Sequence, residues 1–433
     1  MTPDRPDRPA IAFDPAFGLD RLPRATLAVL GREWLMHGHL QDRVCMPLVL
    51  ARHDREAMEQ VAITEWMAAS PVYSRRMQRA LRFEGDGVDT IFKNLQLDIG
   101  APHRFMDFRL VLRDHDHGEF FLAHCGALMD VEPLGDDFVH GMCHSIEDPT
   151  FDATAAATNP RAQIRPIHRP PRRPADRQPH CHWTVQIDPS HPEVAPHPYA
   201  ELVAQSVAAR CVVTRPRPGA EPGGWDDYSG PFDPDFELED LSLPALVVAL
   251  QEFALQSHLL VRGYGLAVAD LEGAEAAGAL IADAVVGVAG VTAQRLARAF
   301  YLGSGTHALA ALLQLHPLFW PRTYVTPYLA LDEDGVRFSL SGDAPVFSEP
   351  DGLTWLAALP GPAERALGAI GRVIDPRMRV RSVAPTSGER CAYEFVLDPA
   401  ADPAPEEREV LLGMISTGAT FELPARRPVR HSL

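Results

Sequence analysis

Lysine is almost missing from this chain of 433 residues: Lys93 is the one lysine, and arginine supplies every other basic side chain. Arginine keeps its proton in proteins and cannot form the Schiff base that pyridoxal phosphate needs, so we expect no pyridoxal-phosphate cofactor. A GxxxxGK[ST] phosphate loop and a GxSxG elbow are also absent, and "GYGLAV" (263–268) lacks the third glycine of a dinucleotide site. The sequence therefore has no nucleotide-binding motif.

Basic charge is scarce overall, since 40 basic residues face 58 acidic ones and the net charge is −18. Nucleic acid and anionic membranes attract basic surfaces, so neither is expected as a partner. Six unevenly spaced cysteines without a CxxC pair are not a disulfide framework, and the longest apolar region, Gly278 to Val291, is short and carries Asp283. With no apolar core at the N-terminus to indicate a signal peptide, we expect a cytoplasmic protein with reduced thiols.

An internal repeat is the strongest pattern in the sequence. Residues 13–43 and 232–262 are identical at 12 of 31 positions at a constant offset of 219. We therefore predict two copies of one module that pack as a pseudo-dimer, and a homo-oligomer of the whole chain is also possible. The predicted organisation is a disordered tail (1–12), a first copy (13–213), a Pro/Gly-rich linker (214–231), a degenerate second copy (232–424) and a tail (425–433).

Each copy is predicted to begin with helices and to end in a mainly antiparallel sheet, which is an α+β fold. The predicted helices are about 23–38, 54–69, 74–83 and 87–98, with counterparts at 243–260, 273–288, 292–301 and 306–315. Apolar alternation predicts strands at 105–113, 119–124 and from Cys181 onward. The segments "DHDHG" (114–118) and "DEDG" (332–335) have the composition of hairpin turns.

The two predicted copies differ in their number of histidines. Of eighteen, eleven fall between His103 and His197, and residues 321–424 have none. His39 and Arg43 have the counterparts His258 and Arg262, so we interpret these four as structural. Three clusters are special to the first copy and are candidates for chemistry: "AHCGAL" (123–128), "HGMCHSIED" (140–148) and "PHCH" (179–182).

Two kinds of site fit these clusters. A zinc or iron site needs three or four ligands, and the candidate ligands are His140, His144, His180 and His182. Alternatively, Cys125 or Cys143 is a nucleophile, with a neighbouring histidine as base and Asp148 as the group that orients it. Buried thiols beneath a histidine-rich surface are the third interpretation, because free cysteines are among the most buried residues.

An arginine-rich stretch, 161–179, adds a candidate anion site. Its prolines predict an extended arm without regular structure. Arg165 and Arg169 are the candidate substrate-binding residues, since a guanidinium group suits a carboxylate or phosphate. The alternative is that these arginines pair with the chain's own carboxylates.

In "PHCHWTVQID" (179–188), strand alternation places Cys181 on an apolar face and His180 with His182 on the other. A strand that ends in Cys125, then Cys143 followed by Asp148, then a strand that opens with Cys181 and an aromatic residue, resembles the pattern of the L-2-amino-thiazoline-4-carboxylic acid hydrolase-like family.

The resemblance covers about residues 60–188. It implies helices before the cysteine-bearing strands and ring-opening hydrolysis of a carbon–nitrogen bond in a small heterocyclic acid. The sequence thus predicts a hydrolase-like protein that acts on a small anionic molecule. The competing hypothesis is a regulatory protein that binds a metal or a ligand without turnover.

Overall fold

The first half of the chain is built on two long helices. A computed structural model describes residues 11–217, 221–331, 335–356 and 363–423. After the short 3-10 helix η1 (Leu19–Arg21), the helices are α1 (Arg24–Leu50), α2 (Arg55–Ala80) and α3 (Val88–Leu95). The prediction of separate helices at 54–69 and 74–83 is wrong, because α2 runs through Pro71 without a break. Residues around Pro71 are buried, and this packing outweighs the hydrogen bond that proline cannot donate.

A four-stranded antiparallel sheet completes the first half. Its strands, β1 (Met106–Leu112), β2 (His117–Cys125), β3 (Ala162–His168) and β4 (Cys181–Ile187), lie in the order β1-β2-β4-β3. The hairpin predicted at 114–118 is confirmed, because β1 pairs with β2 around it. Between β2 and β3 the chain is helical: α4 (Gly126–Val131), η2 (Glu132–Leu134), α5 (Asp136–His140), the π-helix η3 (Gly141–Ile146) and α6 (Glu147–Ala155). The half ends in α7 (Pro198–Ala204) and α8 (Val207–Arg210).

The second half has a similar order of elements. Its helices are η4 (Leu238–Asp240), α9 (Leu243–Glu272), α10 (Ala274–Ala299), α11 (Thr306–Leu315), η5 (Pro317–Phe319), η6 (Pro345–Ser348), α12 (Ala363–Ile374), α13 (Arg408–Met414) and η7 (Thr417–Ala419). Its strands are β5 (Pro327–Leu331), β6 (Gly335–Ser341), β7 (Met378–Val383) and β8 (Glu389–Leu397), in the order β5-β6-β8-β7. The helices predicted at 273–288 and 292–301 are one helix, α10. The chain is thus α+β, as predicted.

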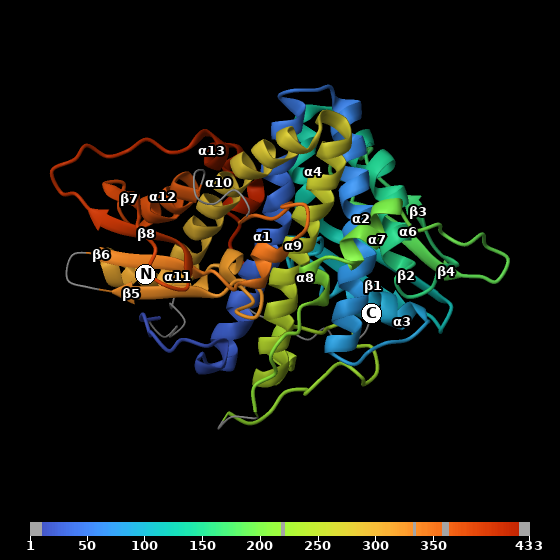
Figure 1. Ribbon diagram of the computed structural model, residues 1–433. Coiled ribbons are helices and arrows are strands. Elements are labelled where there is room, and N and C mark those ends of the chain that lie inside the picture. Colours follow the sequence, from blue (N-terminus) through green and yellow to red (C-terminus); the bar gives the residue numbers. More distant parts are fainter. Residues whose placement is uncertain (1–10, 218–220, 332–334, 357–362, 424–433) are drawn as a thin grey trace, which may run out of the picture.

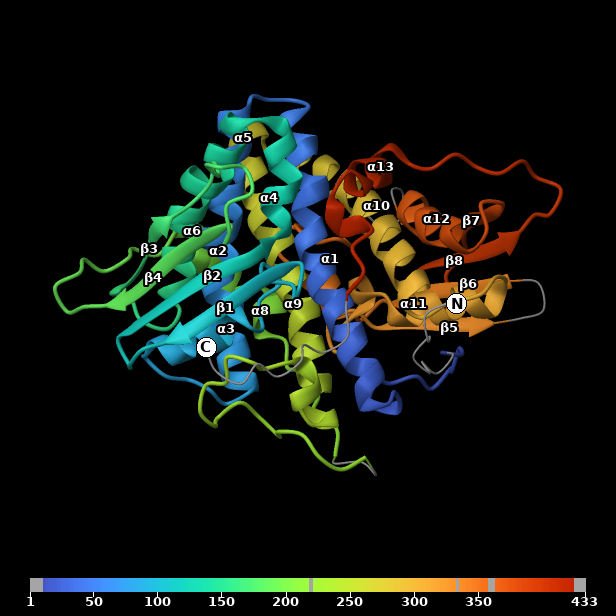
Figure 2. The same cartoon turned by 180° about the vertical axis from the view of Figure 1, so that it is seen from behind.

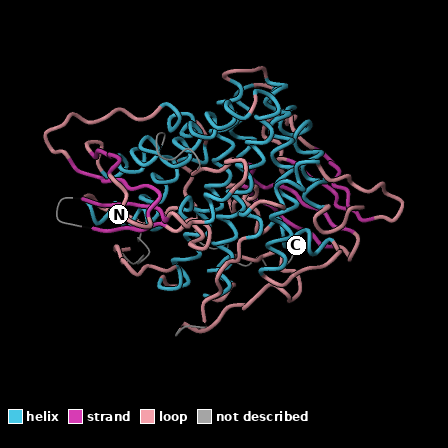
Figure 3. The backbone as a smooth tube through the Cα atoms, viewed as in Figure 1, coloured by secondary structure: helices cyan, strands magenta, loops and turns pink. Residues whose placement is uncertain are grey.

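The long helices of both halves meet in the middle of the molecule, and the two sheets lie on opposite flanks (Figures 1 and 2). Colouring by secondary structure shows the same arrangement, with strands at both ends (Figure 3). Helix α1 packs against α9 and α10, and α2 packs most extensively against α9. A continuous buried core therefore joins residues of the two halves, such as Leu27 and Val61 with Leu246 and Val285.

Helices α9 and α10 are long and apolar enough to cross a membrane by length and composition. Their most apolar windows are 100% and 78% buried inside the protein, so most of this apolar surface packs against other helices.

Two segments expected to lack regular structure are ordered. Residues 162–168 of the proline-arginine stretch form β3, which pairs with β4, so the prediction of a structureless arm is wrong there. The backbone groups of this stretch bond to β4 despite Pro166, because β3 is an edge strand. In the predicted linker, Tyr228 is buried and stacks on Phe236.

Candidate functional site

A cavity beneath the first sheet is lined by several ionisable side chains. It has a volume of about 130 Å³ and lies between α1, α2, α6 and strands β1 and β2. We call it the Glu147 cavity. Its ionisable lining residues are His39, Asp42, Arg43, Asp98 and Glu147. Buried charges without partners are costly, so such a group of side chains is the expected sign of a ligand or catalytic site.

Helix α1 supplies three of these side chains. His39, Asp42 and Arg43 lie three and four residues apart and therefore share a face. Asp42 Oδ2 accepts a hydrogen bond of 2.9 Å from Nε1 of Trp66, whereas Oδ1 is buried and has no hydrogen-bond partner within the described residues. Burial raises the pKa of Asp42 to about 6, although neighbouring Arg43 favours its charged form.

Arg43 is only loosely satisfied by the protein. Its Nε lies 3.7 Å from Oδ2 of Asp130, beyond a hydrogen bond, and is buried without a hydrogen-bond partner among the residues described. Asp130 instead accepts hydrogen bonds from Ser416 and Thr417 of the second half. The Arg43 guanidinium therefore retains the capacity to bind an anion.

Glu147 is placed by the π-helix. The wide turn of η3 ends at Ile146, and Glu147 opens α6 facing the cavity. Its Oε2 is buried and unpartnered in the described part of the chain. Burial raises the pKa of Glu147 to about 8, against the opposing charge of Arg169. A carboxyl group with this pKa exchanges protons near neutral pH, which is the property of a general acid–base catalyst. Single π-helical turns are frequent at functional sites.

His39 and Asp98 complete the polar wall. The ring of His39 packs edge-on against Phe105, with centroids 4.9 Å apart, and burial lowers its pKa well below the usual value. Its imidazole is therefore neutral. Asp98 accepts hydrogen bonds from Tyr73 and from the backbone of Gly100, and burial raises its pKa to about 6.

A second cavity, of about 200 Å³, adjoins the first. We call it the Leu134 cavity. Five residues line both cavities, namely Asp42, Arg43, Trp66, Met142 and Ile146. The remaining wall is mainly apolar, and part of it comes from the second half through Leu412 and Ile415 near α13.

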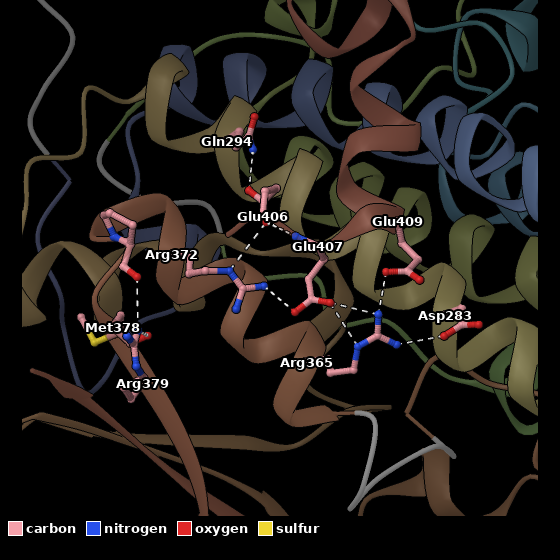
Figure 4. A network of polar contacts seen from close by, with 10 residues as sticks. Asp283, Gln294, Arg365, Arg372, Met378, Arg379, Glu406, Glu407 and Glu409 are labelled. Carbon is pink, nitrogen blue, oxygen red and sulfur yellow. Dashed lines mark hydrogen bonds and ion pairs between the residues drawn. The ribbon is translucent and has the colours of Figure 1, made fainter. Parts of the chain in front are cut away.

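Ion pairs hold α13 in this position (Figure 4). Arg365 of α12 pairs with three carboxylates, those of Asp283 on α10 and of Glu407 and Glu409 at the start of α13. Arg372 adds a second pair to Glu407. Together with the bonds from Ser416 and Thr417 to Asp130, these contacts fix both ends of the segment that closes the Leu134 cavity.

The sequence-predicted cysteines are buried and lie outside the lining of either cavity as far as the described residues define it. Cys125 Sγ accepts a hydrogen bond from the backbone of Leu128 at the start of α4, and burial raises its pKa to about 12. Burial, together with Glu147, also raises the pKa of Cys143 well above its usual value. Reactive cysteines need a lowered pKa, so both thiols have the character of core residues. Cys181 is buried on the inner face with Trp183, as predicted.

The four predicted metal ligands do not form one group. The rings of His140 and His144 lie 4.6 Å apart, but His180 and His182 are on β4 or just before it and have other partners. Nδ1 of His180 accepts a hydrogen bond from the backbone of Cys125, and His182 bonds to Glu119 at 2.9 Å.

Within the described ranges, no group of three or more histidine, cysteine, aspartate or glutamate side chains is arranged to hold a metal ion. The nitrogen Nε2 of His144 bonds to the carbonyl of Pro170, and Nδ1 of His140 bonds to the carbonyl of Asp136. Each ring therefore has one nitrogen bonded to a backbone carbonyl.

The predicted substrate-binding arginines pair with carboxylates of α6. Arg165 bonds to Asp152, and Arg169 to Asp148, which therefore has an arginine rather than a histidine as its partner. Arg169 also lies over the ring of Trp183, 5.7 Å from its centroid. This is the alternative that the sequence left open, in which the arginines pair with the chain's own acids.

Sequence reasoning missed the α1 residues of the site. His39 and Arg43 have counterparts at His258 and Arg262, and this match suggested a structural role. The informative signal was Asp42, because the second half has Val261 at that position. The counterpart Arg262 has other partners, since its two terminal nitrogens bond to Asp351, while its Nε, like that of Arg43, has no hydrogen-bond partner among the described residues.

In comparisons with known proteins, no family model, curated protein or solved structure matches this chain. The fold is α+β, and the first half contains a cavity lined by ionisable side chains.

Proposed function

We propose that the first half binds a small anionic molecule in the Glu147 cavity and hydrolyses a carbon–nitrogen bond in it. Arg43 binds the anionic group, and Glu147 is the general acid–base catalyst. The observation that carries this proposal is the unpartnered Oε2 of Glu147 in a cavity that Arg43 also lines. The resemblance of the cysteine-bearing strands to the L-2-amino-thiazoline-4-carboxylic acid hydrolase-like family supports the reaction type and a small heterocyclic acid as substrate.

The reaction needs one water molecule. The Glu147 carboxylate takes a proton from water while the water oxygen forms a bond to the electrophilic carbon. The Glu147 carboxyl group then gives that proton to the leaving nitrogen as the carbon–nitrogen bond breaks. Glu147 returns to its starting state, and the product contains the added water. A pKa of about 8 suits both transfers, since neither proton donation nor proton acceptance is strongly unfavourable near neutrality.

In this proposal, the thiols of Cys125 and Cys143 shape the core and do not attack the substrate, because burial keeps them protonated. Asp148 and Arg169 are positioning residues. Their ion pair lies beside Glu147 in sequence and holds the start of α6 against β4.

We also propose that the two halves are copies of one module that pack as a pseudo-dimer. Reciprocal ion pairs support this proposal. Arg76 pairs with Glu252, and Arg295 pairs with Glu33, so each pair joins one half to the other. Both arginines and both glutamates are related by the same offset of 219 that relates the repeated sequences. Exchanged contacts of this kind are typical of a two-fold interface.

In this proposal the second copy is a packing partner, and the functional site lies in the first copy. The cavity beneath its sheet has a volume of about 20 Å³ and is lined by apolar side chains, including Phe319, Phe338 and Trp355.

Replacement of Glu147 by glutamine tests the proposed function. Glu147→Gln keeps the shape of the side chain but cannot exchange a proton, so we expect hydrolysis of 2-amino-thiazoline-4-carboxylate to fall by about 10² to 10⁴-fold. The substrate Kd should change little. The matched control is Glu84→Gln, because Glu84 is exposed and lies far from Glu147 in the sequence.

Unchanged turnover in Glu147→Gln would overturn the proposal. Binding of the acid by the unaltered protein without any turnover would favour the regulatory ligand-binding hypothesis instead.

A further inference from the structure

The proposed hydrolysis takes place in the Glu147 cavity and does not require the Leu134 cavity, so the Leu134 cavity serves another purpose. It adjoins the Glu147 cavity across Arg43, and its wall is built mainly from apolar side chains of α1, α2, the segment from η2 to η3, and α13. Members of this wall include Met46, Leu50, Met58, Val131, Phe138 and Leu412.

We infer that the ligand is an amphiphilic acid, whose carboxylate binds Arg43 and whose apolar group fills the Leu134 cavity. This inference rests on the proposed function, because it assigns the far end of the molecule that reacts at Glu147. The carboxylate lies at the junction of the two cavities, the reacting bond extends into the Glu147 cavity, and the apolar group extends into the other.

The size of the Leu134 cavity fits this occupant. An apolar cavity of about 150 Å³ is large enough to bind benzene in a protein core. The Leu134 cavity, at about 200 Å³, therefore accommodates a phenyl ring or a short branched alkyl group. The cavity therefore leaves room for an apolar substituent on the small acid that reacts at Glu147.

The charges around the cavity leave Arg43 as the anion-binding group. Three carboxylates also line the wall: Glu59 pairs with Arg55, Asp130 accepts bonds from Ser416 and Thr417, and Asp42 accepts a bond from Trp66 through Oδ2. The buried Nε of Arg43 has no such bond to any residue that the structure describes.

The mouth of the Leu134 cavity is marked by exposed apolar side chains. Leu134 is 58% exposed and Ile415 is 76% exposed, although both line the cavity. Apolar side chains at the rim of a cavity are typical of a binding site. The ligand would pass between η2 of the first half and the end of α13.

A chain-length series tests the inference on the full-length protein. The probes are acetate, butyrate, 3-phenylpropionate and the uncharged 3-phenylpropanamide, and Kd is measured by isothermal titration calorimetry. We expect Kd to fall about fourfold for each buried methylene group and 3-phenylpropionate to bind more tightly than its amide.

Two variants test where each end of the ligand binds. Ala62→Phe fills the cavity wall and should weaken 3-phenylpropionate at least tenfold while acetate keeps its Kd. Arg43→Met should weaken both acids and leave the amide unchanged. If Ala62→Phe fails to fold, Ile415→Ser at the exposed rim replaces it, with Leu202→Ser on α7 as the control for an exposed apolar residue.

Equal affinity for acetate and 3-phenylpropionate, or tight binding of the phenyl acid by a folded Ala62→Phe protein, would overturn the inference. These outcomes are separate from a failure of the proposed function, because binding at the Leu134 cavity does not require Glu147. Loss of turnover in Glu147→Gln together with no chain-length dependence would leave the hydrolase proposal standing and remove this one.

Discussion

At the scale of single residues, burial decides which groups do chemistry. The sequence drew attention to cysteines and histidines of the first half, and their types suggested a nucleophile or a metal. Their environments could not be predicted, because a local pattern does not show that Cys125 is buried or that His182 faces Glu119. Asp42 looked like an ordinary helix acid in the sequence, and Glu147 was one member of the candidate cluster at 140–148. Their unpartnered oxygens beside a cavity are visible only in the structure.

The pKa of Glu147 predicts how stability depends on pH. Its folded-state pKa of about 8 lies above the usual value of 4.5, so the folded protein binds the proton more tightly than the unfolded chain does. Glu147 therefore makes the free energy of unfolding decrease as pH rises from about 4.5 to 8, by up to about 1.4 kcal/mol per pH unit. Urea unfolding between pH 5 and 8 should show a shallower decrease for Glu147→Gln than for the unaltered protein. Parallel curves would show that Glu147 has an ordinary pKa.

At the scale of helices and strands, the sequence predicted the long helices and three strands of the first sheet, but not the continuity of the helices or the shorter elements. Apolar periodicity located the helices of both halves, while breaks placed near residues 70–73 and 289–291 were absent. Those residues are buried between long helices, and the sequence alone does not reveal that packing. The π-helix η3 was not predicted from the sequence, and it contacts α2, α5 and α6 in the structure.

The prediction at the scale of helices concerns the ion pairs of Arg365 that keep α13 in place. Arg365→Ala leaves Asp283, Glu407 and Glu409 near one another without their shared cation, so their repulsion should loosen α13. We expect amide hydrogen exchange of residues 408–419 to accelerate about tenfold, measured by mass spectrometry, with little change in β1 to β4. The control is Arg381→Ala, whose ion pair with Glu394 is exposed on the sheet. Unchanged exchange in α13 would mean that other contacts hold it.

At the scale of the whole molecule, the repeat in the sequence predicted two modules, and in the structure the long helices of the two halves pack against one another. Helix α1 contacts α9 and α10, and a shared core runs between the flanking sheets. The offset of 219 could be read from the sequence. The exchange of Arg76 and Arg295 between halves could not, because it depends on how the helices cross.

Two halves that share a core should unfold together. Glu33 and Glu252 are both buried and each pairs with an arginine of the opposite half. Removal of one partner from a buried pair leaves an unpaired charge, which costs about 3 to 5 kcal/mol. Glu33→Gln and Glu252→Gln should therefore lower the Tm by similar amounts in calorimetry, each within a single transition. Glu394→Gln, in an exposed pair, should change the free energy of unfolding by less than about 1 kcal/mol. Two separate transitions, each sensitive to one substitution, would show instead that the halves are independent domains, and the second copy could then not stabilise the site in the first.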